Sequence, residues 1–420
     1  MRTREVIIGA IVGSVLLFVV GIVIGHYAIP KSTDESKSNV AYLNTECTTT
    51  TYDAEWDTYR NKYLQEAVES SCNKATCNTE DLPRTYISYH LNGKSIDIDG
   101  QLDDPAWLEV PWTDSFMDIR GPEYPKPYFD TKVKVRWDNE RLYVGARMEE
   151  THFWGNITED ESLVWTENAF EVYVVPDGSL HNYKELQISV MNVTWDLMLK
   201  KAYIDFGTPC DKSEAFDSSW NSDMRKATFT DGIVNDINST GTFWSAEWSF
   251  SFERLAQHTD RPAGKLKPDE NEAWFFIFAR PEYKYKVVNG KYVKDESAPT
   301  EWWSWQPLYT VNLHLPSRFG LVQFKKKMND KTFKWEKWHL YRALFEVFEA
   351  EHKYKSINGM FIDDMSQLQL APKIMSTSCV DLSVTLGDGN FTVTAISKLD
   401  SNLPQAHIRD DRYVWFTDRV

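Results

Sequence analysis

Alternation of hydrophobic and polar positions with a period of two dominates the chain from residue 85 to residue 325. Short β-branched or aromatic segments occur there, separated by Asn, Asp, Gly and Pro, as is typical of strands joined by turns. The expected strands are 132–137, 142–148, 169–175, 186–190, 244–250 and 274–278. Many short strands without long helices between them predict a mainly β protein with an antiparallel β-sandwich at residues 85–325.

Helical spacing of apolar residues appears in two other places. Behind Asp53, a possible N-cap, apolar residues recur at helical spacing from Trp56 to Ala67, which predicts one short helix inside a stalk at residues 31–84. Residues 333–355 carry a second amphipathic pattern that ends near Gly359. Strand-like segments follow at 381–386, 391–396 and 413–416. Residues 326–420 are therefore expected to form a small α+β extension packed on the sandwich.

A hydrophobic run near the N-terminus indicates the location of the protein. Residues 6–25 contain no charge, and at about 1.5 Å per residue they are long enough to cross the ~30 Å hydrocarbon layer of a membrane as one helix. A cleaved signal peptide is the alternative, but the residues after the run match its cleavage site poorly. We expect residues 1–30 to form a cytoplasmic tip and a transmembrane signal anchor. This predicts a single-pass type II membrane protein with an extracellular or lumenal ectodomain.

Two features of the sequence bear on self-association. Gly9, Gly13, Gly21 and Gly25 repeat the GxxxG spacing that lets two membrane helices approach closely, although small residues are common in such spans anyway. The five cysteines, Cys47, Cys72, Cys77, Cys210 and Cys379, favour disulfides in an exported domain, for example from Cys47 to Cys72 or Cys77. Their odd number leaves one thiol free or available between chains. A homodimer through the span or through this cysteine is an expectation.

Composition and short motifs bear on nucleic-acid binding, on exposed aromatic residues and on N-glycosylation. The net charge of -16 makes nucleic acid an improbable ligand. Aromatic residues make up 14 % of the chain, more than a core of this size requires, so some are expected on the surface. Four N-x-[ST] triplets begin at Asn156, Asn192, Asn238 and Asn390, and they are candidate N-glycosylation sites in an exported domain.

An ordered series of motifs between residues 86 and 325 resembles carbohydrate-binding module family 9 and its DOMON-like relatives. The runs are IDGQLDDPAW at 98–107, VRWDNERLYVGARM at 135–148, VWTENAFEVYVVPDG at 164–178, LQISVMNVTWDLMLKKAY at 186–203, FWSAEWSFSFERL at 243–255 and WWSWQPLYTVNLHLPSRFGLVQF at 302–324. The resemblance implies a calcium-stabilised jelly-roll sandwich that binds sugars and is often attached to glycoside hydrolases.

The resemblance also implies which residues hold the sugar. Trp165 falls where the family has an aromatic platform, and Glu171 where it has a hydroxyl-binding glutamate. Gln187 and Ser189 stand where better-studied members carry Arg and Asn. The chain therefore lacks the positive charge and the forked hydrogen-bond donor of that Arg. Strand alternation places Glu171 opposite the core if Phe170 and its even-numbered neighbours fill it.

The second platform of the family is missing from its usual position, which Leu313 occupies. Trp303 and Trp305 are expected to supply it, with Trp302 on the other face of the strand; the alternative is that all three tryptophans pack in the core or at its rim. Arg280 and His314 are expected to donate hydrogen bonds to sugar hydroxyls, although a structural histidine is an equal alternative.

A short acidic stretch is a candidate for calcium. Asp97, Asp99, Asp103 and Asp104 look like ligands, but they lack the order of an EF-hand loop, and a hairpin turn at Asp99 and Gly100 explains them as well.

The sequence therefore favours an ectodomain that binds a poly- or oligosaccharide, without catalysis and in connection with carbohydrate catabolism. One alternative is a glycosidase, whose paired carboxylates a sequence does not identify. Another is a DOMON-type haem domain, which needs a Met and a His as axial ligands on opposite faces of the haem. Met148 and His152 are too close in sequence for this, so the candidate pairs are Met191 or Met117 with His181. The last is a structural ectodomain that has lost binding.

Overall fold

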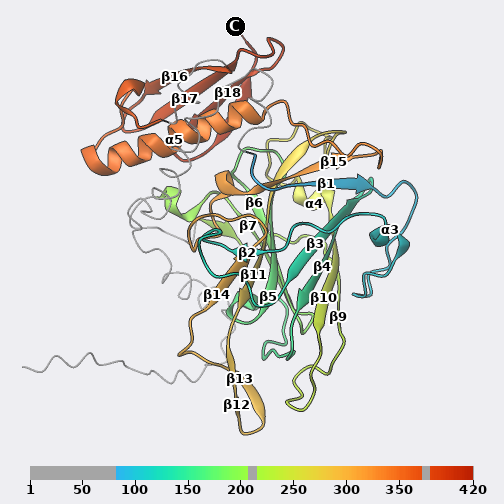
Figure 1. Ribbon diagram of the computed structural model, residues 1–420. Coiled ribbons are helices and arrows are strands. Elements are labelled where there is room, and N and C mark those ends of the chain that lie inside the picture. Colours follow the sequence, from blue (N-terminus) through green and yellow to red (C-terminus); the bar gives the residue numbers. More distant parts are fainter. Residues whose placement is uncertain (1–81, 207–214, 371–378, 420) are drawn as a thin grey trace, which may run out of the picture.

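The computed structural model describes residues 82–206, 215–370 and 379–419, and these form a mainly β protein with few helices (Figure 1). The expected mainly β fold is thereby confirmed. Within these ranges no helix is long and apolar enough to cross a membrane. The hydrophobic run at 6–25 and the expected stalk helix lie outside the described residues, so both stay predictions.

One 13-stranded sheet curls into two layers, with the strand order β8-β7-β6-β5-β11-β15-β1-β3-β4-β10-β9 and with β14 joining β11 to β2. The first layer contains β2 (Met117–Asp118), β5 (Ala169–Val175), β6 (Tyr183–Ser189), β7 (Thr194–Leu199), β8 (Phe216–Asp217), β11 (Ala273–Glu282) and β14 (Glu301–Ser304). The second contains β1 (Thr85–His90), β3 (Thr131–Trp137), β4 (Arg141–Glu149), β9 (Arg225–Thr230) and β10 (Phe243–Ser251), and β15 (Gly320–Lys325) joins β11 of the first layer to β1 of the second. Because β1 pairs in parallel with both β15 and β3, the sheet is mixed and not purely antiparallel.

The core between the layers is built by strand alternation. Phe170, Val172 and Val174 of β5 point inward and meet side chains such as Val133 and Val135 of β3. Because every second residue of a strand faces the same side, the odd-numbered residues of β5 must lie on the opposite face of the sheet. We call that face of β5, β6, β7, β11 and β14 the outer face.

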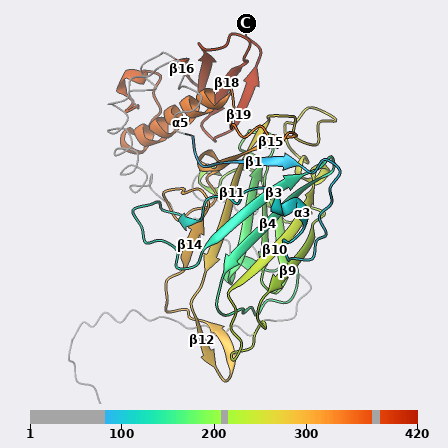
Figure 2. The same cartoon turned by 45° about the vertical axis from the view of Figure 1, so that its right-hand side comes forward.

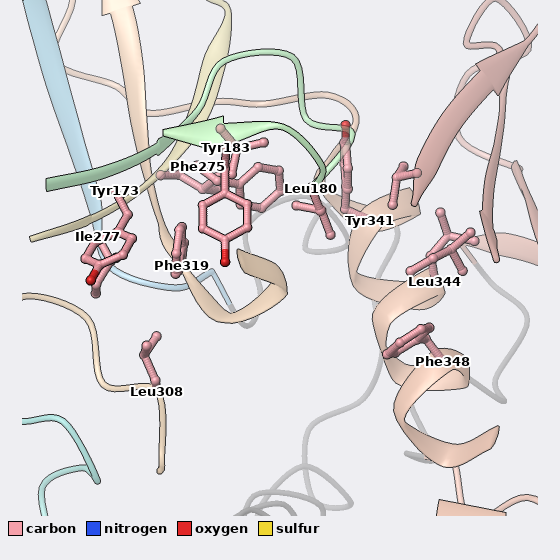
Figure 3. Packing of buried hydrophobic residues seen from close by; sticks show 14 of the residues in the cluster. Tyr173, Leu180, Tyr183, Phe275, Ile277, Leu308, Phe319, Tyr341, Leu344 and Phe348 are labelled. Atoms are coloured by element: carbon pink, nitrogen blue, oxygen red, sulfur yellow. The ribbon is translucent and has the colours of Figure 1, made fainter. Parts of the chain in front are cut away.

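The outer face is covered as well, so every residue of β5 is buried. Tyr173, Tyr183 and Phe275 belong to a second hydrophobic cluster that continues into the C-terminal helix α5 (Trp338–Asn358) through Tyr341 and Leu344 (Figure 3). Loop residues such as Leu308 also pack there. A sheet with two buried faces needs apolar residues at consecutive positions, which explains the sequence AFEVYVV.

The C-terminal unit is the expected helix with a small sheet (Figure 1). The sheet has the order β16 (Val380–Leu386), β17 (Phe391–Ser397), β18 (Gln405–Arg409) and β19 (Val414–Thr417), all antiparallel. Helix α5 ends at Gly359, whose positive φ of 82° lets its N–H bond the carbonyl of Lys355 at 2.7 Å. The sequence had not indicated β18.

Smaller elements complete the described chain. A two-stranded hairpin, β12 (Tyr285–Val288) and β13 (Lys291–Lys294), projects from the end of the sandwich away from the C-terminal unit (Figures 1 and 2). The short helices are α3 (Pro105–Leu108), α4 (Phe252–Leu255) and the 3₁₀ turns η1 (Val164–Thr166), η2 (Tyr203–Phe206), η4 (Pro316–Arg318) and η5 (Met365–Gln367).

Candidate functional site

Three of the residues selected from the sequence meet on the outer face of β5 and β6. Glu171 pairs directly with Gln187, and Ala169 pairs with Ser189. The three polar side chains are almost fully buried, with Glu171 0 % and Gln187 1 % exposed. The parity argument for Glu171 is correct, and the face on which it lies is covered.

The polar groups of this face form a short hydrogen-bonded series. The Tyr173 hydroxyl donates to Glu171 Oε2 at 3.1 Å, and Gln187 Nε2 donates to Glu185 Oε1 at 2.6 Å. Burial, and then the charges of Glu171 and Glu185, raise the pKa of Tyr173 well above its ordinary value. The oxygen of the same amide, Gln187 Oε1, is buried and accepts no hydrogen bond from the described part of the chain. A buried acceptor without a donor is costly, so this oxygen is where a ligand hydroxyl would gain most.

Trp165 lies at the entrance to β5, on the turn η1. Its ring is half-buried and packs against the hydrophobic cluster of the outer face. Two side chains fix the turn: the Tyr283 hydroxyl donates to the Trp165 carbonyl at 2.7 Å, and Lys294 Nζ donates to the carbonyl of Thr166 at 3.2 Å. The base of the β12–β13 hairpin thereby holds the backbone of Trp165 in place.

Trp302 approaches the same area from the other side. It is half-buried, packs against the outer-face cluster and pairs with Pro281 of β11. Since Ala279 of β11 pairs with Glu171, continuing this antiparallel register places Pro281 beside Ala169. Trp302 is therefore two strands from Ala169, roughly 10 Å at ~4.8 Å per strand. Trp165 and Trp302 flank a stretch of sheet with small residues.

Trp303 and Trp305 do not fit their expected role as the second sugar platform. Both rings lie in the core between the two layers, with exposures of 2 % and 1 %. Alternation along β14 did separate them from Trp302 as expected, but the pair faces the core and Trp302 faces the outer side.

Arg280 also lies on the core side, where it has no access to the outer face. Its guanidinium is fully buried and donates hydrogen bonds to the carboxyl groups of Glu282 at 2.8 Å and Glu150 at 3.1 Å. It also donates to Thr131 Oγ1 at 3.1 Å. These bonds tie β3, β4 and β11 together, so the expected role of Arg280 as a sugar donor is wrong.

His314 reaches the outer face as part of its cover. Its ring lies among three tyrosines, with centroid distances of 4.4 Å to Tyr203, 5.6 Å to Tyr173 and 6.4 Å to Tyr183. A hydrogen bond of 3.1 Å joins Nδ1 to the Tyr183 hydroxyl. The preceding Leu313 is buried in the outer-face cluster. The segment carrying Leu313 and His314, which we call the cover loop (residues 305–315), therefore closes the face on which Glu171 lies.

The acidic stretch expected to bind calcium holds a turn together. Asp104 accepts from the Asp97 N–H at 2.9 Å, and Asp99 accepts from the Gln101 N–H at 2.9 Å. Asp103 is exposed. Within the described ranges no group of three or more His, Cys, Asp or Glu side chains is arranged to hold a metal ion. Calcium binding at Asp97, Asp99, Asp103 and Asp104 therefore stays a prediction.

The anchor of this turn is a carboxylate that the sequence did not indicate. The buried Glu247 of β10 accepts from the N–H groups of Asp99 and Gly100, both at 2.9 Å, and from Trp107 Nε1 at 2.6 Å. Gly100 has a φ of +89°, and a Cβ there would lie 2.6 Å from the backbone of Thr228. The run IDGQLDDPAW is thus required for a tight turn against β9 and β10.

The sequon asparagines and the cysteine that the structure describes do not belong to one site. All four sequon asparagines, Asn156, Asn192, Asn238 and Asn390, are exposed, so they are accessible for glycosylation. Cys379 is the one cysteine within the described residues; it is disulfide-bonded, and its partner lies outside them.

The expected haem ligands are not brought together. Met148 is buried in the core between the layers. His181 Nε2 hydrogen-bonds the carbonyl of Asp411 at 2.7 Å, and Met191 follows the opposite end of β6. Met117 lies on β2, paired with Ser304.

Sequence reasoning missed four residues of the outer face. Glu185 and Tyr183 share the strand parity of Gln187, so the same alternation argument identifies them. Tyr203 and Tyr283 come from elsewhere in the chain, and no pattern in the sequence connects them with Glu171.

Comparison with known proteins supports the family resemblance. Residues 98–205 match the model of the family "Carbohydrate family 9 binding domain-like". The resemblance to carbohydrate-binding module family 9 is therefore confirmed over this part of the chain. No sequence among the curated proteins matches the chain significantly.

Similar solved structures include a family 9 carbohydrate-binding module from Caldicellulosiruptor kristjanssonii. In complex with cellotriose it is 15 % identical with a TM-score of 0.34, and the match covers 59 % of this chain and 97 % of that one. In complex with glucose it is 14 % identical with a TM-score of 0.34, and the match covers 59 % and 98 %. A protein from Bacteroides uniformis assigned to carbohydrate binding is 11 % identical with a TM-score of 0.38, and the match covers 58 % and 100 %.

Proposed function

We propose, on the basis of the family 9 match over residues 98–205, that this chain binds a neutral sugar at the outer face between Trp165 and Trp302. The observation that carries the proposal is the pairing of Glu171 with Gln187, whose Oε1 is buried and accepts no bond from the described residues. Half-buried Trp165 precedes β5 on the turn η1, and half-buried Trp302 lies at the level of Ala169, two residues before Glu171. No catalytic step is part of the proposal.

The chemistry of a pyranose fits these groups. One face of the ring is a flat set of C–H bonds that stacks on an indole, and its hydroxyls both donate and accept. Gln187 Oε1 and the Glu171 carboxylate accept hydrogen bonds from neighbouring hydroxyls. Hydrogen bonds to charged groups contribute about 1.5–3 kcal/mol each, more than those between neutral groups. Glu171 is therefore expected to contribute more than Gln187.

Access to Glu171 requires movement of the cover loop. Leu313 and His314 occupy the outer face, so a sugar reaches the carboxylate only in the fraction of molecules in which the cover loop has opened. The apparent dissociation constant of the sugar is then the intrinsic value divided by that fraction. We infer that binding is weaker than the contacts alone would give.

The purified full-length chain tests this proposal by titration with glucose and cello-oligosaccharides, the ligands of the similar Caldicellulosiruptor structures. Calorimetry and tryptophan fluorescence report binding. Trp165→Ala should abolish it with the melting temperature unchanged. Trp112→Ala is the matched control, because Trp112 is also half-buried but packs against Leu102 and Trp107 in a separate cluster.

One alternative is favoured by a specific observation, the burial of Glu171 and Gln187 beneath the cover loop. A face that never opens makes the domain a structural ectodomain without ligand. A folded chain that binds no sugar in any of these titrations would establish that reading.

We further propose that residues 6–25 anchor the chain in a membrane with residues 31–420 outside the cytoplasm. Twenty consecutive uncharged residues support this, as do the four sequons. Retention in the membrane pellet after alkaline carbonate extraction, with release by detergent, is the expected result. Release by carbonate alone would contradict it. No calcium dependence is part of this proposal.

A further inference from the structure

The C-terminal sheet has one face on α5 and an opposite face that points away from it (Figure 2). Phe391, Val393 and Ile408 pack toward α5 in the hydrophobic cluster. Because side chains alternate, Thr394 and His407 lie on the opposite face. We call this opposite face of β16–β19 the distal face.

The strand register defines a row of side chains across the distal face. Ser383 of β16 pairs with Thr394 of β17, Thr394 pairs with His407 of β18, and His407 pairs with Trp415 of β19. Four strands at ~4.8 Å make this row roughly 14 Å long, longer than one sugar ring. The row runs from a hydroxyl at one edge to an indole at the other.

Trp415 is held rigidly although its ring is only half-buried. Its ring is nearly parallel to that of His407, with a centroid distance of 5.0 Å and an interplanar angle of 20°. Tyr413 lies in a similar orientation at 5.7 Å and 20°. His407 is fixed in turn, since its two ring nitrogens hydrogen-bond Thr394 Oγ1 at 2.9 Å and Thr417 Oγ1 at 2.7 Å.

The hydrogen bonds of His407 have a consequence for recognition. An aromatic ring that is already immobilised loses little conformational entropy when a ligand stacks on it. The neighbouring Phe416 shows the contrast, because it packs toward α5 and contacts Tyr341 at 5.6 Å. Trp415 is therefore not part of the hydrophobic cluster around α5, whereas Phe416 packs against it.

Apart from Asp381 and Arg409 at its corners, the rest of the distal face is uncharged and rich in hydroxyls. Ser383 and Thr385 are exposed, and Thr392 and Thr394 are half-buried. Each hydroxyl can both donate and accept a hydrogen bond, as a sugar hydroxyl does.

The two charges at the corners are balanced locally. Asp381 pairs with Lys398 at 2.7 Å, and Arg409 donates to Asp411 Oδ2 at 2.9 Å. In a chain with a net charge of -16, this neutral face does not complement an anionic ligand such as nucleic acid. Its hydroxyls equally disfavour an apolar lipid surface. The charge balance is that expected for an uncharged, polyhydroxylated ligand.

We propose that the distal face is a second binding surface, for a neutral polysaccharide chain. One pyranose stacks on Trp415, and the following residues of the polysaccharide hydrogen-bond the hydroxyls of Thr394, Thr392, Thr385 and Ser383. The surface lies on a different sheet from Trp165 and Glu171, so it does not depend on the sugar site proposed there. If both sites engage one polymer, the second contact becomes intramolecular and raises the overall affinity.

Affinity electrophoresis of the full-length chain in gels containing hydroxyethyl cellulose or soluble starch tests the proposal. Trp415→Ala should lower the affinity for the polymer at least about fivefold, which corresponds to roughly 1 kcal/mol, the scale of one aromatic stacking contact. Trp112→Ala should leave it unchanged. The double variant Thr385→Val and Thr392→Val keeps the shape of the face and removes two hydroxyls, so it should also weaken binding with the melting temperature preserved.

The outcomes separate this surface from the Trp165 site. Glucose binding should be lost in Trp165→Ala and nearly unchanged in Trp415→Ala, because a single ring makes only one of the contacts that the distal face offers to a polymer. Migration of Trp415→Ala and of the threonine double variant like that of the wild type in both gels would overturn the proposal, and so would unretarded migration of the wild type. Glucose binding by the wild type that is lost in Trp165→Ala would show that the Trp165 site is intact under either result.

Discussion

Trp302 and Trp303 are neighbours on β14 and lie on opposite faces of the sheet. Trp303 is buried in the core between the layers and packs edge-on against Tyr128 at 4.8 Å, whereas Trp302 is half-buried against the outer-face cluster. The same residue type thus serves the core at one position and flanks the candidate site at the next.

The two tryptophans are expected to respond differently to truncation. Trp303→Ala should lower the free energy of unfolding by about 3–5 kcal/mol, the usual cost of emptying a buried aromatic position. Trp302→Ala should cost less stability and should weaken sugar binding. Urea unfolding and calorimetric titration of both variants check this. Equal loss of stability in the two variants would show that Trp302 is also a core residue.

Opening of the cover loop gives a second prediction. His314→Ala removes the hydrogen bond to Tyr183, worth about 1 kcal/mol, and the ring contacts with three tyrosines. If sugar binding requires the open loop, the variant should bind glucose about fivefold more tightly, since ~1.4 kcal/mol corresponds to a tenfold change. Its melting temperature should fall slightly.

The control for this prediction is Val311→Ala, a change at an exposed position of the same loop. It should alter neither affinity nor stability. Glucose affinity that is lower in His314→Ala than in the wild type would mean that His314 contacts the sugar directly and does not compete with it.

Strand alternation made much of this arrangement predictable. The inward positions of Phe170, Val172 and Val174, and the separation of Trp302 from Trp303, follow from the period of two. Alternation did not show which of the two series of side chains faces the core between the layers, because both faces of the first layer are buried. The covering groups, Leu313 and α5, come from more than 100 positions further along the chain than β5, and local patterns contain no information about such distant contacts.

The acidic run at 97–104 was ambiguous for a related reason. Carboxylates that cap backbone N–H groups and carboxylates that bind calcium occur in the same turn-rich sequences. Glu247, which anchors this turn, lies more than 140 positions away along the chain, so no local pattern indicates its contact with Asp99 and Gly100.

A variant of Glu247 provides the third prediction. Glu247→Ala leaves three N–H donors without their acceptor, so it should lower the free energy of unfolding by about 3 kcal/mol or more. Adding calcium or a chelator should change the melting temperature of neither the wild type nor the variant. A calcium-dependent rise in the wild-type melting temperature would restore the metal interpretation of Asp97 and Asp99.

The buried acid Glu282 predicts a pH dependence of stability. Burial, together with the neighbouring Glu150, raises the pKa of Glu282 to about 8 despite the opposing effect of Arg280. The folded state therefore holds a proton that the unfolded chain releases near pH 4.5. The contribution of this group to stability is complete below pH 4.5 and is lost as the pH rises through 8.

Glu282→Gln isolates this effect from other titrating groups. The difference in unfolding free energy between the wild type and the variant should decrease steadily between pH 4.5 and pH 8 in urea titrations. A difference that is independent of pH across this window would show that Glu282 remains ionised beside Arg280.

The buried His339 predicts that stability is lost as the pH falls, which is opposite to the effect of Glu282. Its Nε2 hydrogen-bonds Ser397 Oγ at 2.8 Å, and burial lowers its pKa to about 4. The folded state therefore prefers the neutral ring, and its contribution to stability is lost as the pH falls from about 6.5 through 4. His339→Gln should be less sensitive to acid than the wild type in this range. Equal acid sensitivity of the two proteins would contradict the assignment.

The central claim is that Trp165 forms one wall of a sugar site beside Glu171 and Gln187. Calorimetric titration of the full-length chain with cello-oligosaccharides, alongside Trp165→Ala and Trp112→Ala, tests it most directly. We predict binding by the wild type and by Trp112→Ala, and none by Trp165→Ala at an unchanged melting temperature. Undiminished binding by a folded Trp165→Ala, or a melting temperature lowered by many degrees in that variant, would contradict the claim.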